Sequence, residues 1–152
     1  MSPALFEQEV TASLDRSVAA FNAGQPEFFD EFADDATIFA LDSAEPIKGR
    51  EAYRQRYGDA LANQKREKTV LDRSVQIVGN KAVVTQTARI VQAEASANVR
   101  QTIIYGATGE GPKVLHLHTA LMTPNGADNG MAPIRVVNER IATISGQAGV
   151  AQ

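Results

Sequence analysis

The sequence of 152 residues contains no cysteine and only two histidines. Without cysteine the chain can form neither disulfides nor thiolate nucleophiles nor cysteine-ligated zinc, and it suits a reducing compartment. Basic residues are not in excess either, because 15 Lys and Arg stand against 18 Asp and Glu, a net charge of -3. A surface that follows nucleic-acid phosphates needs a basic surplus, so we expect no nucleic-acid partner.

Long apolar runs are also missing. No stretch approaches the roughly 18 consecutive apolar residues of a membrane-spanning helix. The N-terminus, MSPALFEQEV, carries acidic residues where a secretion signal has basic and apolar regions. We therefore expect a cytoplasmic protein without membrane contact. With 43% apolar and 22% charged residues, the composition is that of an ordinary globular protein, and the length suits one domain.

The first part of the sequence has the pattern of helices. A long helix is expected from Ser2 to Gly24, because Ser and Pro suit a helix start and Gly suits its end. PEFFDEFA, residues 26–33, predicts a short second helix. REAYRQRYGDALANQ, residues 50–64, predicts a third helix with tyrosines four residues apart. Between them DATIFALD, residues 35–42, is rich in strand-forming residues.

Strand patterns follow from Thr69 onward. Two β-branched runs meet at Gly79-Asn80, which predicts a hairpin. NVRQTIIYG and KVLHLHTALM form a second pair across a glycine-rich turn. Helices first and strands afterwards predict an α+β fold, in which the helices pack on one face of a curved antiparallel sheet and a cavity can lie between the layers.

The domain organisation follows from these patterns. We expect residues 1–122 to form the core of the domain and residues 123–133, rich in Gly, Asn and Pro, to form a loop. Residues 134–152 would add a C-terminal strand and tail to the same domain. The strand itself would span residues 134–145, and it could cap the cavity or pair with a neighbour.

Short motifs, in order along the chain, resemble one superfamily. RSVAAFNAG, FADDAT and EPIKGREAYRQRY are similar to the N-terminal half of ketosteroid isomerases and SnoaL-like polyketide cyclases. VQIVGNKAVVTQTARIVQ, RQTIIY and VLHLHTALM resemble stand-alone relatives of the calcium/calmodulin-dependent kinase association domain. Residues 5–122 thus resemble the nuclear-transport-factor-2-like superfamily. The resemblance implies a cystatin-like, cone-shaped fold, in which a bent antiparallel sheet wraps three helices around a pocket.

The resemblance to ketosteroid isomerases does not extend to their catalytic residues. Those enzymes use a carboxylate base on the first strand, a tyrosine on the first helix and a protonated Asp on the sheet. Ala40 and Ser17 occupy the positions of the base and the tyrosine, so steroid-type enolisation is disfavoured. Asp42 keeps the strand parity of Ala40 and could be a shifted base, although we favour a surface position. For Asp34 and Asp35 we favour a structural role at the corner before the strand.

Three residues are expected to line the pocket besides the histidines. Arg89, in ARIVQ, takes the place of an arginine that faces the cavity in the kinase-association relatives and could bind an anionic ligand there. Ile103 replaces their second arginine, so a two-arginine clamp is in doubt, and Arg89 could also be a solvated surface residue. Tyr53 and Tyr57 share one helix face and could pack in the core with their hydroxyls at the cavity edge.

The two histidines stand one residue apart in VLHLHTALM. Strand alternation places His116 and His118 on one face and Leu115, Leu117 and Leu121 on the other. The outer sheet face often joins subunits in this family. We therefore expect the leucines to form a homodimer contact and the histidines to face the pocket.

Several chemistries are open to such a pocket. Two histidines alone do not complete a metal site, so we expect neither a metal nor another cofactor. The leading hypothesis is a SnoaL-like pocket protein that binds a small organic molecule, an anionic one among the options, through Tyr53, Tyr57, Arg89, His116 and His118. One alternative is an isomerase, cyclase or dehydratase with His118 as proton carrier. The other is an oligomerisation module without catalysis.

Overall fold

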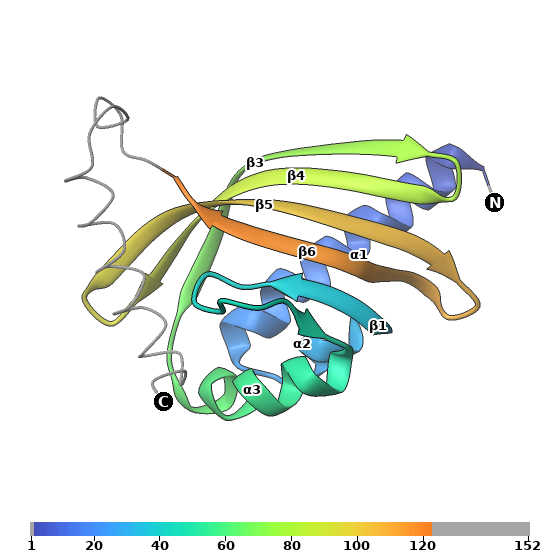
Figure 1. The fold of residues 1–152 in the computed structure, drawn as a ribbon. Helices are drawn as coiled ribbons and strands as arrows, with labels where there is room; N and C mark the ends of the chain where they lie inside the picture. Colours follow the sequence, from blue (N-terminus) through green and yellow to red (C-terminus); the bar gives the residue numbers. More distant parts are fainter. Residues whose placement is uncertain (1, 123–152) are drawn as a thin grey trace.

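The computed structural model describes residues 2–122, which form three helices and one sheet of six strands. The helices are α1 (Pro3–Ala23), α2 (Glu27–Asp30) and α3 (Arg50–Asn63). The strands are β1 (Phe32–Phe39), β2 (Ile47–Lys48), β3 (Glu67–Val78), β4 (Lys81–Gln92), β5 (Ala95–Thr108) and β6 (Gly111–Leu121). In Figure 1 the long strands curve over the helices, which gather on one face of the sheet.

The sheet has the order β2-β1-β6-β5-β4-β3. Strands β3 to β6 form an antiparallel meander, whereas β1 runs parallel to β6. Parallel neighbours need a long crossover connection, and here it consists of α3 and the other meander strands. The predicted α+β class with a curved sheet wrapped on helices is therefore confirmed. The prediction of an antiparallel sheet is wrong in one respect: the sheet is mixed, because β1 joins the edge of the meander in parallel with β6.

The ends of α1 lie where the sequence predicts them. The Ser2 Oγ accepts a hydrogen bond from the Leu5 N–H at 3.2 Å, and Pro3 occupies the first turn. Gly24 ends the helix in the left-handed conformation, with φ 69°. A Cβ at Gly24 would lie 2.7 Å from the carbonyl oxygen of Leu61, so glycine also permits close contact between α1 and α3.

The second helix is shorter than predicted. It ends at Asp30, and the chain enters β1 at Phe32. The Glu31 carbonyl accepts a hydrogen bond from the Val114 N–H at 2.8 Å, so pairing with β6 ends the helix early. Asp34 consequently lies on β1, exposed to solvent, and forms a 2.5 Å ion pair with Arg50 at the start of α3. This contact agrees with the structural role expected for that aspartate.

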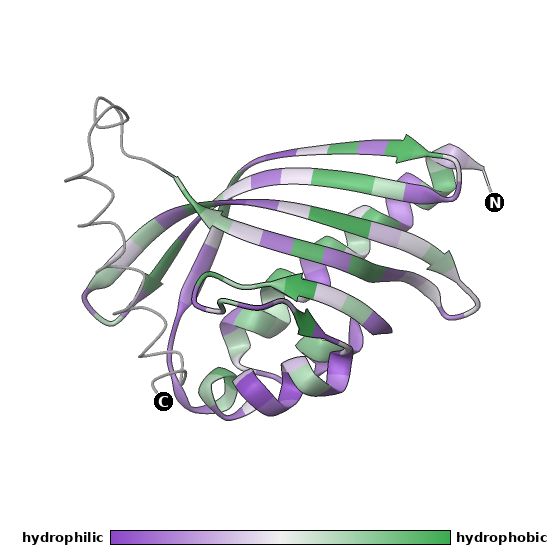
Figure 2. Ribbon diagram, in the orientation of Figure 1, coloured by the Kyte–Doolittle hydropathy of each residue, from purple (hydrophilic) through white to green (hydrophobic). Residues whose placement is uncertain are grey.

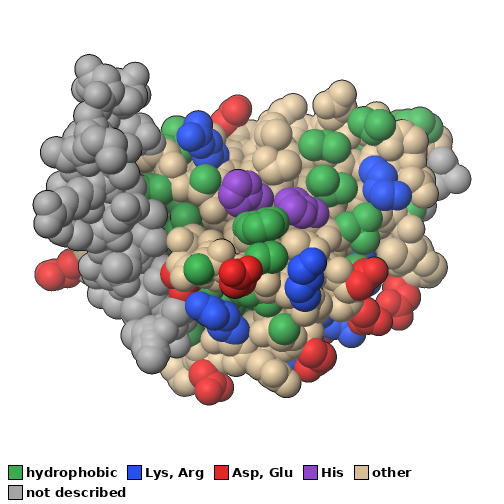
Figure 3. All heavy atoms as spheres, viewed as in Figure 1, with side chains coloured by type: hydrophobic (Ala, Val, Ile, Leu, Met, Phe, Trp, Pro, Cys, Tyr) green, Lys and Arg blue, Asp and Glu red, His purple; other side chains and the backbone are tan. Residues whose placement is uncertain are grey.

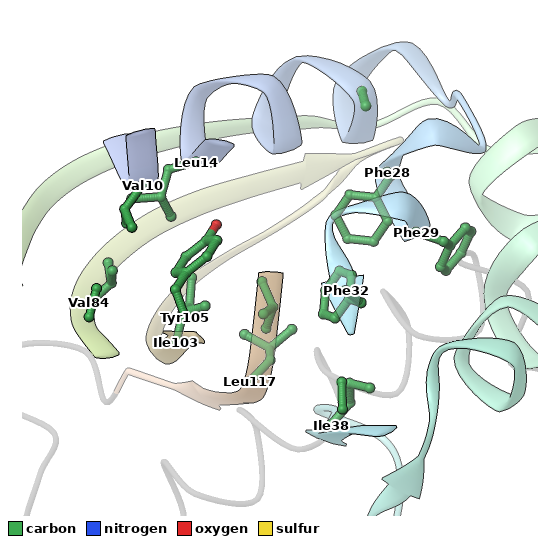
Figure 4. Close-up of a cluster of buried hydrophobic side chains, with 14 of the residues drawn as sticks. Val10, Leu14, Phe28, Phe29, Phe32, Ile38, Val84, Ile103, Tyr105 and Leu117 are labelled. Carbon is green, nitrogen blue, oxygen red and sulfur yellow. The ribbon is translucent and has the colours of Figure 1, made fainter. Parts of the chain in front are cut away.

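The core fills the space between the helices and the inner face of the sheet. Figure 2 shows apolar and polar residues interspersed along the long strands, as expected for a sheet with one covered face. Buried side chains from α1, α2 and four strands point toward one another in Figure 4. The labelled members are Val10, Leu14, Phe28, Phe29, Phe32, Ile38, Val84, Ile103, Tyr105 and Leu117.

A β-bulge in β6 changes which residues face the core. Ile104 of β5 pairs with His116 and Tyr105 pairs with Val114, so Leu115 is an extra residue in the strand. An extra residue reverses the alternation beyond it. Val114 is therefore buried before the bulge and the odd-numbered residues, beginning with Leu117, face inward after it.

Two other expectations concern parts of the chain that lie outside the described residues. These are the loop at residues 123–133 and the C-terminal strand at residues 134–145. Among residues 2–122, no helix combines the length and the apolar character needed to cross a membrane.

Candidate functional site

A cavity of about 170 Å³ lies between the helices and the inner face of the sheet. Most of its wall is apolar, and a few polar side chains interrupt that wall. Such a lining is typical of sites for small organic molecules. The apolar wall includes Leu14, Phe21, Ile38, Ile90, Ile103 and Leu117.

Asp42 and Tyr57 form a hydrogen-bonded pair in the cavity wall. The Tyr57 hydroxyl donates to Asp42 Oδ1 at 2.5 Å, and the Asp42 side chain is only 12% exposed. The other carboxylate oxygen, Oδ2, lies 3.7 Å from Nη2 of Arg56 and accepts no hydrogen bond within the described chain. The surface position favoured for Asp42 is therefore wrong. Its alternative placement, as a carboxylate displaced from Ala40 but still in the pocket, matches the structure.

The two tyrosines of α3 both line the cavity, as expected. Their ring centroids are 5.4 Å apart, and Tyr53 also packs edge-on against Phe32 at 5.1 Å. Burial raises the pKa of Tyr53 well above its ordinary value. The pKa of Tyr57 is raised as well, by burial first and then by its hydrogen bond to Asp42. Both phenols are therefore neutral near pH 7 and can donate hydrogen bonds.

Lys68, near the start of β3, brings an amine to the cavity wall. Its Nζ donates to Gln101 Oε1 at 2.7 Å and lies 5.9 Å from the ring centroid of Phe21. Burial lowers the pKa of Lys68 to about 8, and the positive charge of Arg73 adds to this effect. Residues 65–68, KREK, read in the sequence only as a small basic cluster, so sequence reasoning missed this position.

A row of polar side chains crosses four strands beside Lys68. Arg73 Nε donates to Gln86 Oε1 at 3.1 Å, and Gln86 Nε2 donates to Gln101 Oε1 at 2.8 Å. Gln101 Nε2 donates in turn to Thr119 Oγ1 at 3.0 Å. These residues are direct cross-strand partners. Because Arg73 can only donate, it sets the direction of both amides and turns the Gln101 oxygen toward Lys68.

Arg66 also lines the cavity, but its contacts give it a structural role. The side chain is buried, and its guanidinium donates to the carbonyl oxygens of Ala60 at 2.6 Å, Leu61 at 3.0 Å and Phe21 at 3.1 Å. These oxygens lie near the ends of α1 and α3, where helices leave carbonyls without partners. Arg66 therefore joins two helix ends.

The histidines lie on the outer face of the sheet. His118 is exposed and His116 is half-buried, and their rings lie 5.6 and 5.8 Å from the ring of Phe39. Neither lines the cavity. Both are visible side by side on the surface in Figure 3. The orientation predicted for them is wrong, because the bulge at Leu115 reverses the strand alternation.

Arg89 lies on the outer face as well. It is exposed, and its Nε donates to Asn98 Oδ1 at 3.4 Å. Strand β4 pairs with β5 without interruption, so the buried neighbours Gln86 and Ala88 point inward with Ile90 while Arg89 points out. The structure agrees with the alternative interpretation of Arg89, that of a solvated surface residue.

The predicted leucine stripe is divided between the two faces. Leu117 is 7% exposed and belongs to the core. Leu121 pairs with Val99, which is fully buried, and so also points inward. Leu115 packs beside Gly106, where a Cβ would lie 2.7 Å from the leucine Cδ1. Of the three leucines, only Leu115 is on the outer face, so the stripe itself does not exist.

The positions equivalent to the isomerase catalytic residues do reach the cavity. Ala40 and Ser17 both line it, so the sequence alignment of these two positions is consistent with the structure. Within residues 2–122, no group of three or more His, Asp or Glu side chains is arranged to hold a metal ion.

Helices packed on a curved sheet around an internal cavity define an α+β pocket domain. The SnoaL-like domain family matches residues 10–124 of this sequence. The chain belongs to the SnoaL-like family. No curated protein matches the sequence.

Solved structures show the same fold. A nuclear-transport-factor-2-like protein of unknown function from Pseudomonas putida has a TM-score of 0.72 and 20% identity, covering 86% of this chain and 95% of that one. A candidate dehydratase of that family from Streptomyces avermitilis has a TM-score of 0.71 and 19% identity, covering 80% and 99%. A candidate calcium/calmodulin-dependent kinase II association domain from Xanthomonas campestris has a TM-score of 0.67 and 22% identity, covering 77% and 87%. The predicted resemblance to the superfamily is confirmed.

Proposed function

We propose that the protein binds a small organic molecule in this cavity and catalyses a proton transfer on it, with Asp42 as the proton acceptor. The observation that carries the proposal is the Asp42–Tyr57 hydrogen bond inside an otherwise apolar wall. A part-buried carboxylate beside a neutral phenol is an arrangement suited to general acid–base chemistry. Enolisation-driven isomerisation, aldol-type cyclisation and β-elimination of water all need such a proton transfer from carbon.

The polar groups of the cavity have separate tasks in this proposal. Tyr57 holds one oxygen of Asp42, and the second oxygen, which accepts no hydrogen bond within the described chain, is the proposed proton acceptor. Lys68 uses one of its N–H groups on Gln101 and has others with which to polarise a ligand oxygen. The apolar wall excludes water and strengthens both interactions. His118 has no part in this chemistry because it lies on the opposite face of the sheet.

A binding screen tests the first half of the proposal. Ring ketones, hydroxy ketones and small carboxylic acids are added to the protein, and a ligand should raise the melting temperature. Ala40→Phe, at the residue that follows β1, fills the cavity and should abolish that rise, whereas Ala107→Phe, at an exposed position on β5, should not. Equal shifts in the two variants would show that binding takes place elsewhere.

Proton transfer is tested separately by exchange in D2O. Loss of the α-proton signal of a bound ketone is followed by NMR with the natural protein and with Asp42→Asn. Removing a general base slows such a step by about 10²–10⁴-fold. Asp35→Asn, an exposed carboxylate on β1, is the matched control. Exchange that continues unchanged in Asp42→Asn would refute the assignment of the base.

A second candidate function is assembly through the outer face of the sheet. Phe39 is 37% exposed and lies against both histidine rings, so an aromatic cluster faces outward. Exposed aromatic groups of this kind are typical of subunit contacts. If the contact is a homodimer, Phe39→Asp should halve the mass measured by light scattering. Leu5→Asp, at a position on α1 that is 45% exposed, should leave the mass unchanged.

A further inference from the structure

Lys68 differs from the other lysines by its surroundings. It lines the apolar cavity, and within residues 2–122 no carboxylate forms an ion pair with it. Its hydrogen-bond partner is a neutral amide oxygen, that of Gln101. By contrast, Lys48 and Lys65 are exposed. An amine that faces a ligand cavity without a counter-ion is well placed to act as a nucleophile.

The groups around Lys68 favour its neutral form. Arg73 reaches the same polar row through Gln86, and its positive charge disfavours a second positive charge on Lys68. Asp42 and the neutral Tyr57 face the same cavity, and the carboxylate is hydrogen-bonded by the phenol. Burial together with Arg73 lowers the pKa of Lys68 to about 8. About a tenth of the amine is then neutral at pH 7, against less than a thousandth for an ordinary lysine.

We propose that Lys68 forms an imine with the carbonyl group of an aldehyde or ketone bound in the cavity. This deepens the proposed function, on which it rests, by naming the class of substrate. The neutral Nζ attacks the carbonyl carbon and gives a carbinolamine. Loss of water then forms the C=N bond, and the carbonyl oxygen leaves in that water.

The geometry supports each part of this step. The Gln101 oxygen accepts one N–H of the amine and fixes Nζ at 2.7 Å, because that oxygen is itself held by Gln86 at 2.8 Å. The apolar wall favours the release of water. A protonated imine withdraws electrons from the neighbouring carbon and makes its proton acidic. Asp42, in the same cavity, is the carboxylate that would accept that proton.

Reductive trapping tests the inference. The protein is incubated at pH 7 with cyclohexanone or benzaldehyde and cyanoborohydride, and the adduct is located by peptide mass mapping. We expect an adduct at Lys68 at least tenfold faster than at Lys65, which is exposed and three residues earlier. The rate at Lys68 should also saturate with ketone concentration, as a bound reactant requires. The N-terminal amine, with an ordinary pKa of about 8, supplies the unsaturable internal standard.

Variants and a second ligand series separate the possible failures. Lys68→Arg keeps the charge and should abolish the saturable adduct, whereas Lys65→Arg should leave it unchanged. The alcohols cyclohexanol and benzyl alcohol cannot form imines, and their thermal shifts report on the cavity alone. If the alcohols bind but the ketones give no adduct at Lys68, the imine is refuted and the binding function stands. If the alcohols fail to bind, and the amount of adduct at each lysine follows only the exposure of that lysine, both the imine and the binding function are refuted.

Discussion

Replacing Lys68 by methionine should change how the stability of the protein depends on pH. The folded state lowers the pKa of Lys68 from an ordinary value of 10.5 to about 8. Below pH 8 the amine is protonated in both states, and the folded state carries the full cost of the charge. Between pH 8 and 10.5 the unfolded chain binds more protons than the folded one, so stability rises with pH. Above 10.5 the cost is gone.

The magnitude follows from that difference in pKa. At pH 7 the cost is about 3 kcal/mol, since each pKa unit corresponds to about 1.4 kcal/mol. By pH 9.5 it has fallen to about 1 kcal/mol on the same relation. Methionine has no charge to bury, so its variant shows no such rise. We therefore expect the natural protein to gain about 2 kcal/mol relative to Lys68→Met between pH 7 and 9.5.

Urea unfolding at several pH values from 7 to 9.5 measures this gain directly. Tyrosines do not interfere in that window: burial raises the pKa of Tyr53, Tyr57 and Tyr105, so they lower stability only above about pH 10. Lys65→Met, at an exposed site, should give a curve parallel to that of the natural protein. A parallel curve for Lys68→Met would refute the reasoning, because the amine would then have an ordinary pKa in the folded state.

Three further substitutions test other parts of the structure. Tyr57→Phe leaves a part-buried carboxylate without its donor and should lower the free energy of unfolding by about 2 kcal/mol in urea titrations, whereas Tyr53→Phe should cost less. Gly79→Ala should lower the free energy of unfolding by roughly 1 kcal/mol, because Gly79 has a positive φ but open space around it. Gly24→Ala should cost more, because Gly24 has a similar φ and its added Cβ would also meet a backbone carbonyl. Equal losses of stability in calorimetry would contradict the close contact between α1 and α3. His118→Ala should leave ligand affinity unchanged by calorimetric titration, and a clear loss of affinity would return the histidine to the binding site.

The helical part of the fold could be predicted because its signals are local. Ser2, Pro3 and Gly24 fix the ends of α1 through their own hydrogen bonds and backbone angles. The hairpin turn at residues 79–80 is equally local, and the structure places β3 and β4 on either side of it. The parallel pairing of β1 with β6 was not predictable in this way, because it depends on strands about 80 residues apart meeting at one edge.

The candidate site was predicted only in part, and one residue accounts for the largest error. Regular alternation along β6 predicts that the histidines face the cavity, but Leu115 is an extra residue in the strand, so they lie on the outer face. The nearest signal is on another strand: Gly106 leaves the space that Leu115 fills, and glycine within a strand often marks a bulge. Tyr53 and Tyr57 were placed correctly because helical spacing on α3 is uninterrupted.

The energetics of Lys68 support the proposal that the cavity has a function. A domain whose task was assembly alone would be more stable with an apolar residue at this position, since the buried charge costs about 3 kcal/mol at pH 7. The chain instead surrounds the amine with a row of oriented amides from Gln86 to Thr119 and keeps Asp42 and Tyr57 in the same wall. A buried amine that lowers stability and shares a cavity with a carboxylate and a phenol is typical of an active site. The outer aromatic cluster around Phe39 carries no comparable cost, so the energetics favour the proposed function of the cavity over assembly as the only task.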